Sequence, residues 1–146
     1  MRLEGRILRR TRLWRSINRP ESAIIGVQYR ANDDGRIQRP FIVRSATTAP
    51  WFWAGTGLGD GAIFGQELGG YGIEIDQTTP VTPPGTIVLA DIPDLYGPGL
   101  TAQMTYYETP ASAKVFAGGA IDFGGSAMVT AVRRMLENLW ARLATP

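Results

Sequence analysis

The sequence predicts a strand-rich α/β domain that ends in a β-hairpin followed by one long helix. Eighteen glycines and ten prolines argue against a helical bundle, because glycine costs about 1 kcal/mol and proline about 3 kcal/mol in a helix interior. Several short apolar runs are rich in branched residues, as strands are. One long apolar stripe at helical spacing lies near the carboxy terminus. The length of 146 residues and the apolar fraction of 44% are typical of a single globular domain.

The amino-terminal half contains three strand candidates. Residues 23–29 form a branched apolar run that ends at a polar stretch, and this pattern predicts a buried strand followed by a turn. Residues 40–43 predict a second strand, and the aromatic run at residues 51–54 predicts a third. The glycines of residues 55–61 then predict a loop.

Two further strands are predicted in the middle of the chain. Residues 71–76 alternate, with Tyr71, Ile73 and Ile75 expected on one face. Residues 77–85 are rich in proline and threonine, so they end that strand and form a surface crossing. Residues 86–92 then predict a compact apolar strand.

The last third of the chain carries the clearest pattern. Residues 103–109 and 114–116, joined by a short connection, predict a β-hairpin. After a glycine-rich loop at residues 118–125, apolar residues recur at intervals of three and four, which predicts a long amphipathic helix. Ser126 is the expected cap of this helix, because its hydroxyl can accept a bond from an unpaired backbone N–H. The apolar stripe comprises Met128, Val132, Met135, Leu136, Leu139 and Leu143.

The sequence contains no cysteine and no histidine. Disulfides, thiolate nucleophiles, Ser-His-Asp triads and imidazole zinc sites are therefore excluded within this chain. No run approaches the roughly 20 apolar residues that span a bilayer, and the amino terminus has no apolar run of signal-peptide length. We therefore expect no membrane association and a cytoplasmic location.

Residues 1–16 form a basic arm in which most of the charges are arginines. Clustered arginines can bind a phosphate backbone without regard to sequence. Leu13, Trp14 and other apolar residues lie between these arginines, however, and an isolated arm would leave them in water. A solvent face, or a seam against another part of a larger protein, is the favoured interpretation, so nucleic acid is not an expected partner.

A short glycine motif, Gly57-x-Gly59-x-x-Ala62, formally matches a dinucleotide-binding fingerprint. That fingerprint requires a helix amino terminus that presents N–H groups to pyrophosphate. Gly65 and Gly69 follow too closely for a stable helix. A glycine loop beside a site or an interface is the favoured interpretation.

Two pairs of carboxylates have simple structural explanations. Glu74 and Asp76 share one face of a predicted strand, but two carboxylates without a third ligand are a weak metal signal, and a solvated face is favoured. Asp33 and Asp34 precede Gly35, and turn chemistry accounts for them.

Glu108 is the candidate catalytic residue. On its predicted strand it points to the same side as Met104 and Tyr106, so it ends an apolar row at the mouth of the hairpin. Desolvation there is expected to raise the pKa of its carboxyl, which could then serve as a general acid or base. A rim residue that reaches solvent fits the same pattern equally well.

Several sequence blocks occur here in the same order as in proteins similar to the large subunit of N,N-dimethylformamidase. Their order is more specific than any one block, and with residues 18–30 the resemblance covers roughly residues 17–143. The blocks are Trp53-Ala54-Gly55-Thr56-Gly57-Leu58, Tyr71-Gly72-Ile73-Glu74-Ile75-Asp76, Met104-Thr105-Tyr106-Tyr107-Glu108-Thr109-Pro110 and Lys114-Val115-Phe116-Ala117-Gly118-Gly119 leading through Ala120-Ile121-Asp122-Phe123-Gly124-Gly125 into the helix.

The resemblance implies a partial glutamine-amidotransferase-like, flavodoxin-like domain, with residues 17–146 as its carboxy-terminal portion. It also implies an amide hydrolysis that uses one iron held by tyrosines and a glutamate. The family's motif of His, any residue, Glu, Tyr and Trp lies upstream of the matched region and is absent here. Glu108 stands in the segment that supplies the family's outer carboxylate, and it alone is carried over. Tyr106 and Tyr107 are not assigned as iron ligands.

Two functions from different classes follow. In the first, the chain is the carboxy-terminal part of an amidohydrolase-like domain, inactive alone and completed by upstream sequence or by a partner chain. This function implies a homo-oligomer or a partner with the missing half, no cofactor in this chain alone, and iron only in a completed assembly. In the second, the chain is a non-catalytic α/β interaction module whose arginine arm and aromatic residues 51–53 bind another protein.

Overall fold

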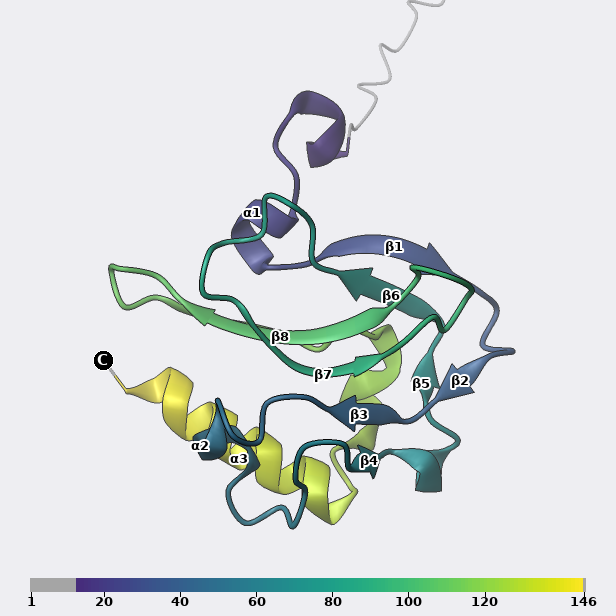
Figure 1. Ribbon diagram of the computed structural model, residues 1–146, viewed down its shortest axis with the longest axis vertical. Helices are drawn as coiled ribbons and strands as arrows, with labels where there is room; N and C mark the ends of the chain where they lie inside the picture. The colour runs from purple at the N-terminus through teal and green to yellow at the C-terminus, as the bar shows by residue number, and fades with distance from the viewer. Residues whose placement is uncertain (1–12, 146) are drawn as a thin grey trace, which may run out of the picture.

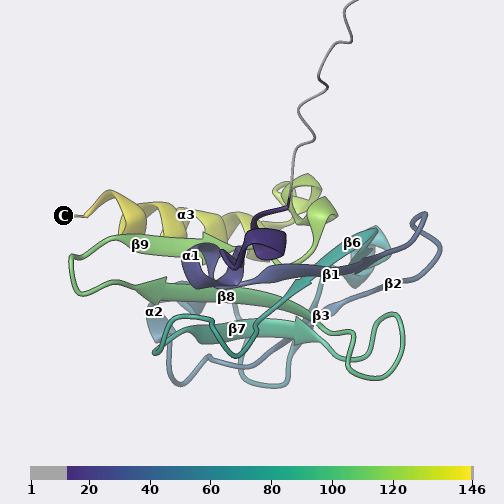
Figure 2. The same ribbon diagram turned by 90° about the horizontal axis from the view of Figure 1, so that it is seen from above.

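A five-stranded antiparallel sheet lies at the centre of the computed structural model, which describes residues 13–145. Figure 1 shows the labelled strands of this sheet side by side, and Figure 2 shows helix α3 (Thr130–Ala144) running along one side of the sheet. A short helix, α2 (Pro50–Trp53), packs against α3. In order across the sheet, the strands are β4 (Ile63–Phe64), β3 (Phe41–Val43), β7 (Ile87–Ile92), β8 (Ala102–Glu108) and β9 (Lys114–Ala117).

The amino-terminal half folds as one long, interrupted two-stranded ribbon. Its three pairings are nested, because β1 (Gln28–Asn32) pairs with β6 (Glu74–Gln77), β2 (Gln38–Arg39) with β5 (Tyr71–Gly72), and β3 with β4. The turn at residues 33–37 interrupts one arm, and the short 3-10 helix η2 (Gln66–Leu68) interrupts the other. The innermost pair, β3 and β4, therefore belongs to the central sheet, whereas the outermost pair, β1 and β6, lies beyond that sheet (Figure 1).

The carboxy-terminal half is a meander followed by the long helix. β7, β8 and β9 pair in sequence, and the β8–β9 hairpin and the helix after it confirm the sequence prediction. Val132, Met135 and Leu139 of α3 are buried in the same cluster as the inward-facing residues of the sheet. The Asn138 side chain donates to the backbone oxygens of α2 and of the residue after it, which ties α3 to α2.

Two predicted strands are wrong in the same way. Residues 23–29 contain a helical turn, α1 (Ser22–Ile25), that Gly26 ends in a left-handed conformation. Residues 51–53 belong to α2, which has Pro50 in its first turn, the position at which proline favours a helix start. Short apolar runs do not distinguish helix from strand by periodicity, which explains both errors. In α2, Phe52 and Trp53 are buried, so residues 51–53 do not form an exposed aromatic binding segment.

Three finer predictions also differ from the structure. Residues 71–76 form two strands, because Ile73 between them has a positive φ of 65° and is partly exposed. Ser126 does not cap α3; it ends the 3-10 helix η3 (Ile121–Ser126), and its hydroxyl donates to the Phe123 carbonyl. Met128 precedes α3 and is exposed, whereas Leu136 is partly buried.

Other predictions are confirmed. β3 and β7 occupy the strands expected at residues 40–43 and 86–92, and residues 55–61 form a loop. A strand, β4, follows the glycine motif at residues 57–62, so no helix amino terminus is available there for pyrophosphate. The Asp33 carboxylate accepts the backbone N–H groups of Gly35 and Ile37, as expected for an aspartate turn.

The whole sheet system in residues 13–145 is antiparallel. A flavodoxin-like domain is organised around a parallel sheet, and the described part of the chain contains no such pairing. Within the same residues, no helix has both the length and the apolar character needed to cross a bilayer.

Most of the expected basic arm, residues 1–12, lies outside the described residues. The arm's last residues lead into a 3-10 turn, η1 (Trp14–Ile17). There the Arg15 guanidinium pairs with the Glu21 carboxylate at 3.1 Å, so this arginine has a protein partner.

Candidate functional site

Glu108 lies at the end of β8, where the β8–β9 hairpin projects beyond the core. Its phenol neighbour, Tyr106, is two residues earlier on the same face of the strand, and the Tyr106 hydroxyl donates to Glu108 Oε1 at 2.5 Å. Arg142 reaches the same oxygen from the last turn of α3, with Nε at 2.9 Å and Nη2 at 2.7 Å. Two segments distant in sequence therefore meet at one carboxylate.

Trp51 of α2 completes this group, which we call the Glu108 cluster (Glu108, Tyr106, Arg142 and Trp51). The Arg142 guanidinium lies over the Trp51 ring, 5.3 Å from its centroid, and the Trp51 and Tyr106 rings meet edge to face at 4.8 Å. Cation–π and aromatic contacts of this kind favour one orientation of each group. Arg142 is thereby held between a ring and a carboxylate.

The pKa of the Glu108 carboxyl is lowered, so the expected increase is wrong. The hydrogen bond from Tyr106 is the largest cause, and the hydrogen bond from Arg142 is the next. The Glu108 side chain is 34% exposed, so desolvation is too weak to reverse these effects. The pKa of the Tyr106 phenol is raised, chiefly by burial and then by its bond to Glu108. At neutral pH the cluster therefore contains an ionised carboxylate and a neutral phenol.

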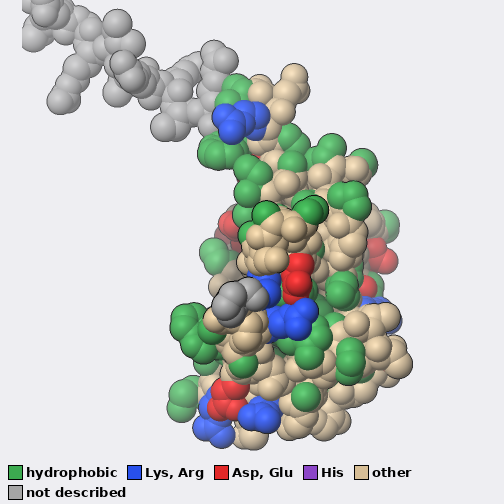
Figure 3. All heavy atoms as spheres, turned by 90° about the vertical axis from the view of Figure 1, so that its left-hand side faces the viewer, with side chains coloured by type: hydrophobic (Ala, Val, Ile, Leu, Met, Phe, Trp, Pro, Cys, Tyr) green, Lys and Arg blue, Asp and Glu red, His purple; other side chains and the backbone are tan. Residues whose placement is uncertain are grey.

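An open groove of about 370 Å³ lies beside the cluster. Figure 3 looks toward the left-hand side of Figure 1, where the hairpin tip and the end of α3 project, and shows acidic and basic side chains meeting near the middle of this face. A second hollow of about 300 Å³ shares Trp51 and Arg142 with the first. The groove is lined by Thr48, Trp51, Gly85, Ile87, Tyr106, Tyr107, Glu108 and Arg142.

The other carboxylates proposed from the sequence do not join this cluster. Burial raises the pKa of Asp76, with Glu74 and Glu21 adding to the effect. Within residues 13–145, no group of three or more acidic, histidine or cysteine side chains is placed to hold a metal ion.

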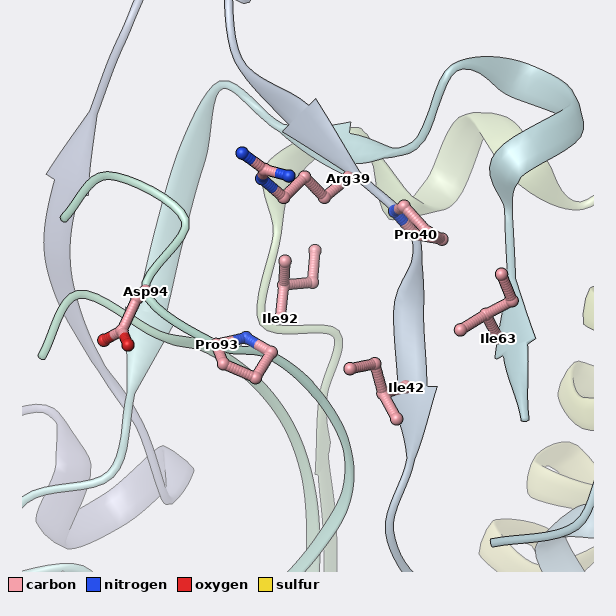
Figure 4. A pocket seen from close by; sticks show the side chains of 7 residues that line it. All are labelled: Arg39, Pro40, Ile42, Ile63, Ile92, Pro93 and Asp94. Atoms are coloured by element: carbon pink, nitrogen blue, oxygen red, sulfur yellow. The ribbon is translucent and has the colours of Figure 1, made fainter. Parts of the chain in front are cut away.

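A larger hollow, a groove of about 520 Å³, lies elsewhere. It lies along β3, β4 and the end of β7 (Figure 4), and five of its seven lining residues are isoleucine or proline. Arg39 and Asp94 are its only charged lining residues, and neither belongs to the Glu108 cluster. The groove therefore offers an apolar surface without a concentrated set of reactive groups.

Glu108 is a candidate from the sequence, but its two partners outside the strand, Arg142 and Trp51, are not. Arg142 lies off the apolar stripe of the helix and has no other sequence signal. The aromatic run that contains Trp51 predicts a strand, whereas Trp51 belongs to α2 and contacts Arg142 and Tyr106 from there. Neither residue is near Glu108 in sequence, so no local signal connects them to it.

Fold and site together define a strand-rich α/β domain with an ion-paired carboxylate at the corner between a hairpin and a helix. A family model described as N,N-dimethylformamidase beta subunit-like, C-terminal, matches residues 3–135, and the chain belongs to this family. The match confirms the resemblance and includes Glu108, Tyr106 and Trp51 but ends before Arg142. A comparison with curated proteins finds no match to this chain.

Proposed function

We propose that this chain is the carboxy-terminal part of an amidohydrolase-like domain, inactive alone and completed by upstream sequence or by a partner chain. The observation that carries the proposal is the family match over residues 3–135, within which Glu108 lies at an open groove. The catalytic centre would form where the completing sequence meets this groove.

The groups around Glu108 do not fit an iron ligand set. Its carboxylate is already bonded to the Arg142 guanidinium, and a fixed positive charge at 2.7 Å opposes a bound cation. The adjacent Tyr106 phenol has a raised pKa, so it is a poor source of a phenolate ligand. Any iron in a completed assembly would therefore depend on ligands from outside the described residues, and we assign no iron ligand in this chain.

Glu108 is suited to accepting a proton or a hydrogen bond. A carboxyl whose pKa is lowered is ionised at neutral pH, which rules out a general-acid role there and leaves the role of acceptor. Tyr106 and Arg142 would position the carboxylate, since both bond its Oε1. This role fits the outer carboxylate that the family resemblance implies.

Completion by another chain or segment would also account for an exposed apolar surface. Five large apolar residues of η1, α1 and their flanks are 44–56% exposed, and hydrophobic side chains gather in the upper part of Figure 3. A contiguous apolar patch of this kind usually marks an interface. We propose a homo-oligomer or a hetero-assembly located in the cytoplasm, in which the completing sequence supplies the parallel strands of a glutamine-amidotransferase-like sheet. The five residues are Leu13, Trp14, Ile17, Ile24 and Ile25.

Activity in isolation is the first test. The purified chain is expected to hold no stoichiometric iron by elemental analysis and to leave simple formamides intact. Stoichiometric iron together with turnover in this chain alone would overturn the proposal.

Association is the second test. Light scattering at tens of micromolar is expected to report a dimer or a larger assembly. A strict monomer would exclude the homo-oligomer and leave completion by a different chain. A search of the neighbouring reading frame for the His-x-Glu-Tyr-Trp motif would then test that alternative.

A matched pair of substitutions tests the site in the completed assembly. Glu108→Gln is expected to abolish amide hydrolysis with the fold retained, because glutamine keeps the shape but cannot take up a proton. Glu137→Gln is the control, since Glu137 is also an exposed carboxylate in an ion pair, at 3.1 Å from Arg134. Equal activity of the two variants would show that Glu108 has no catalytic part.

A further inference from the structure

Helix α3 carries a second row of large side chains beside the row that it buries in the core. Arg133, Leu136, Trp140 and Leu143 follow one another at intervals of three, four and three residues, and we call this row the α3 seam. Intervals of three and four that repeat every seven residues are the spacing by which one helix packs along another. The seam therefore has the pattern of a helix–helix contact.

The seam leaves large side chains in water. Trp140 is 74% exposed and Leu143 is 36% exposed, while Arg133 is exposed and Leu136 is partly buried. Figure 2 shows α3 at the outer side of the sheet, with no other labelled element beyond it. A tryptophan offers a large apolar surface and is enriched at interfaces. An exposed row of this kind marks an interaction site.

The charges around the seam do not favour a strongly charged partner. Arg133 is the only charged residue of the seam itself. Beside it, Arg134 and Glu137 pair with each other at 3.1 Å. Near the end of the helix, the Arg142 guanidinium is paired with the Glu108 carboxylate at 2.7 Å. The surface therefore fits a partner that is mainly apolar and leaves room for one cation at an end.

A second copy of α3 that runs in the opposite direction has this surface. In such a pair, Leu136 of each helix faces Trp140 of the other, so a wide ring meets a narrower side chain twice. Arg133 of each helix faces Leu143 of the other, where its methylene stem covers the leucine and its guanidinium stays in water. A parallel pair would instead bring the two Arg133 charges together and crowd the two Trp140 rings.

We propose that two copies of this chain pair through the α3 seam, with the two helices antiparallel. Both copies contribute the same surface, so the pair closes as a two-fold dimer. The inference rests on the homo-oligomer of the proposed function and names the surface that forms it. The family match ends at residue 135, so three of the four seam residues lie beyond the matched region.

The first test compares two charged substitutions in the whole chain by light scattering and sedimentation at tens of micromolar. Trp140→Glu places a carboxylate in the seam and should raise the dissociation constant of the dimer about thirtyfold or more. Ala141→Glu is the matched control, because Ala141 is exposed and adjacent but lies off the seam, and its effect should stay within about threefold. Both positions are exposed, so circular dichroism should show that both variants keep the fold.

The orientation of the helices is tested by cross-linking, since the chain has no cysteine of its own. A mixture of Arg133→Cys and Leu143→Cys should form a disulfide-linked heterodimer on mild oxidation, because a disulfide requires Cα atoms about 4.4–6.8 Å apart. Arg133→Cys alone should not link to itself, because the two copies of this position would be about 15 Å apart along the antiparallel pair. A mixture of Arg133→Cys and Ala141→Cys is the control, and little linked product is expected.

Three results would overturn the inference. The first is a strictly monomeric wild-type chain, which would also exclude the homo-oligomer of the proposed function. The second is a dimer that Trp140→Glu leaves intact. If Ile24→Glu, in the exposed patch at α1, dissociates that dimer, the homo-oligomer stands and only the α3 interface fails. The third is the absence of a link between Arg133→Cys and Leu143→Cys, whether or not Arg133→Cys links to itself.

Discussion

Leu139 and Leu143 are one helical turn apart on α3, and they differ sharply in burial. Leu139 is 6% exposed, whereas Leu143 is 36% exposed. Truncating a buried leucine to alanine costs about 3–5 kcal/mol when the surroundings cannot collapse into the cavity. Collapse is restricted here, because α3 packs on α2, where the Phe52 and Trp53 rings meet edge to face at 4.9 Å. We therefore expect Leu139→Ala to lower the free energy of unfolding by about 3–4 kcal/mol.

The assay is urea denaturation followed by circular dichroism and tryptophan fluorescence. With a slope of about 2 kcal/mol per molar urea, Leu139→Ala should lower the midpoint by about 1.5–2 M. Leu143→Ala should cost about 1 kcal/mol or less, and the partly buried Leu136 should give about 2 kcal/mol on truncation. If Leu143→Ala destabilises as much as Leu139→Ala, α3 does not pack through the face described above, and the reasoning is refuted.

Three further predictions follow from single contacts. Glu108→Gln should lower the free energy of unfolding at pH 7. The pKa of Glu108 is lowered in the folded state, so its ionised form stabilises the fold at pH values above its ordinary pKa of 4.5. That contribution is lost as the pH falls through the folded-state pKa, so the urea midpoints of variant and wild type should converge in acid; parallel curves would contradict this. Gly65→Ala should destabilise far more than Gly57→Ala in thermal melts, since both glycines have positive φ but only Gly65 would clash, with the Tyr71 ring; equal losses would disprove the clash. Tyr107→Phe should cost about 0.5–1.5 kcal/mol in urea denaturation by removing its hydrogen bond to a backbone carbonyl of α1, and a neutral result would mean that α1 is not held by this contact.

The sequence predicted the elements whose signals are local. The hairpin at residues 103–116 and the helix after it carry complete short-range patterns, and both are present. The central strand at residues 86–92 is bounded by glycine and proline, which locates its ends to within a residue or two. These elements are specified by residues that lie next to one another in the chain.

The errors arise where another part of the fold decides the conformation. Ile73 takes a positive φ opposite the turn at residues 33–37, so the strand breaks despite its alternating sequence. At Glu108, the hydrogen bond from Tyr106 is the largest cause of the lowered pKa, and the next is the hydrogen bond from Arg142, which is 34 residues away in sequence. Burial of Glu108 could be reasoned from the strand pattern, but the arrival of a guanidinium from α3 could not. The pKa of Glu108 was therefore predicted to shift in the wrong direction, and its assignment as a site residue stays a prediction.

The nested order of the ribbon has a consequence for how the chain folds. Once Ile42 pairs with Ile63, the segment between β3 and β4 is the only long loop that has to be closed. Gln38 and Gly72 are then already near each other, and Gln28 and Gln77 follow, so each later pairing closes only a short additional loop. Strand pairs whose residues are distant in sequence can thus form one after another, first β3 with β4, then β2 with β5, and finally β1 with β6. Folding should accordingly be faster than the mean sequence separation of these contacts indicates.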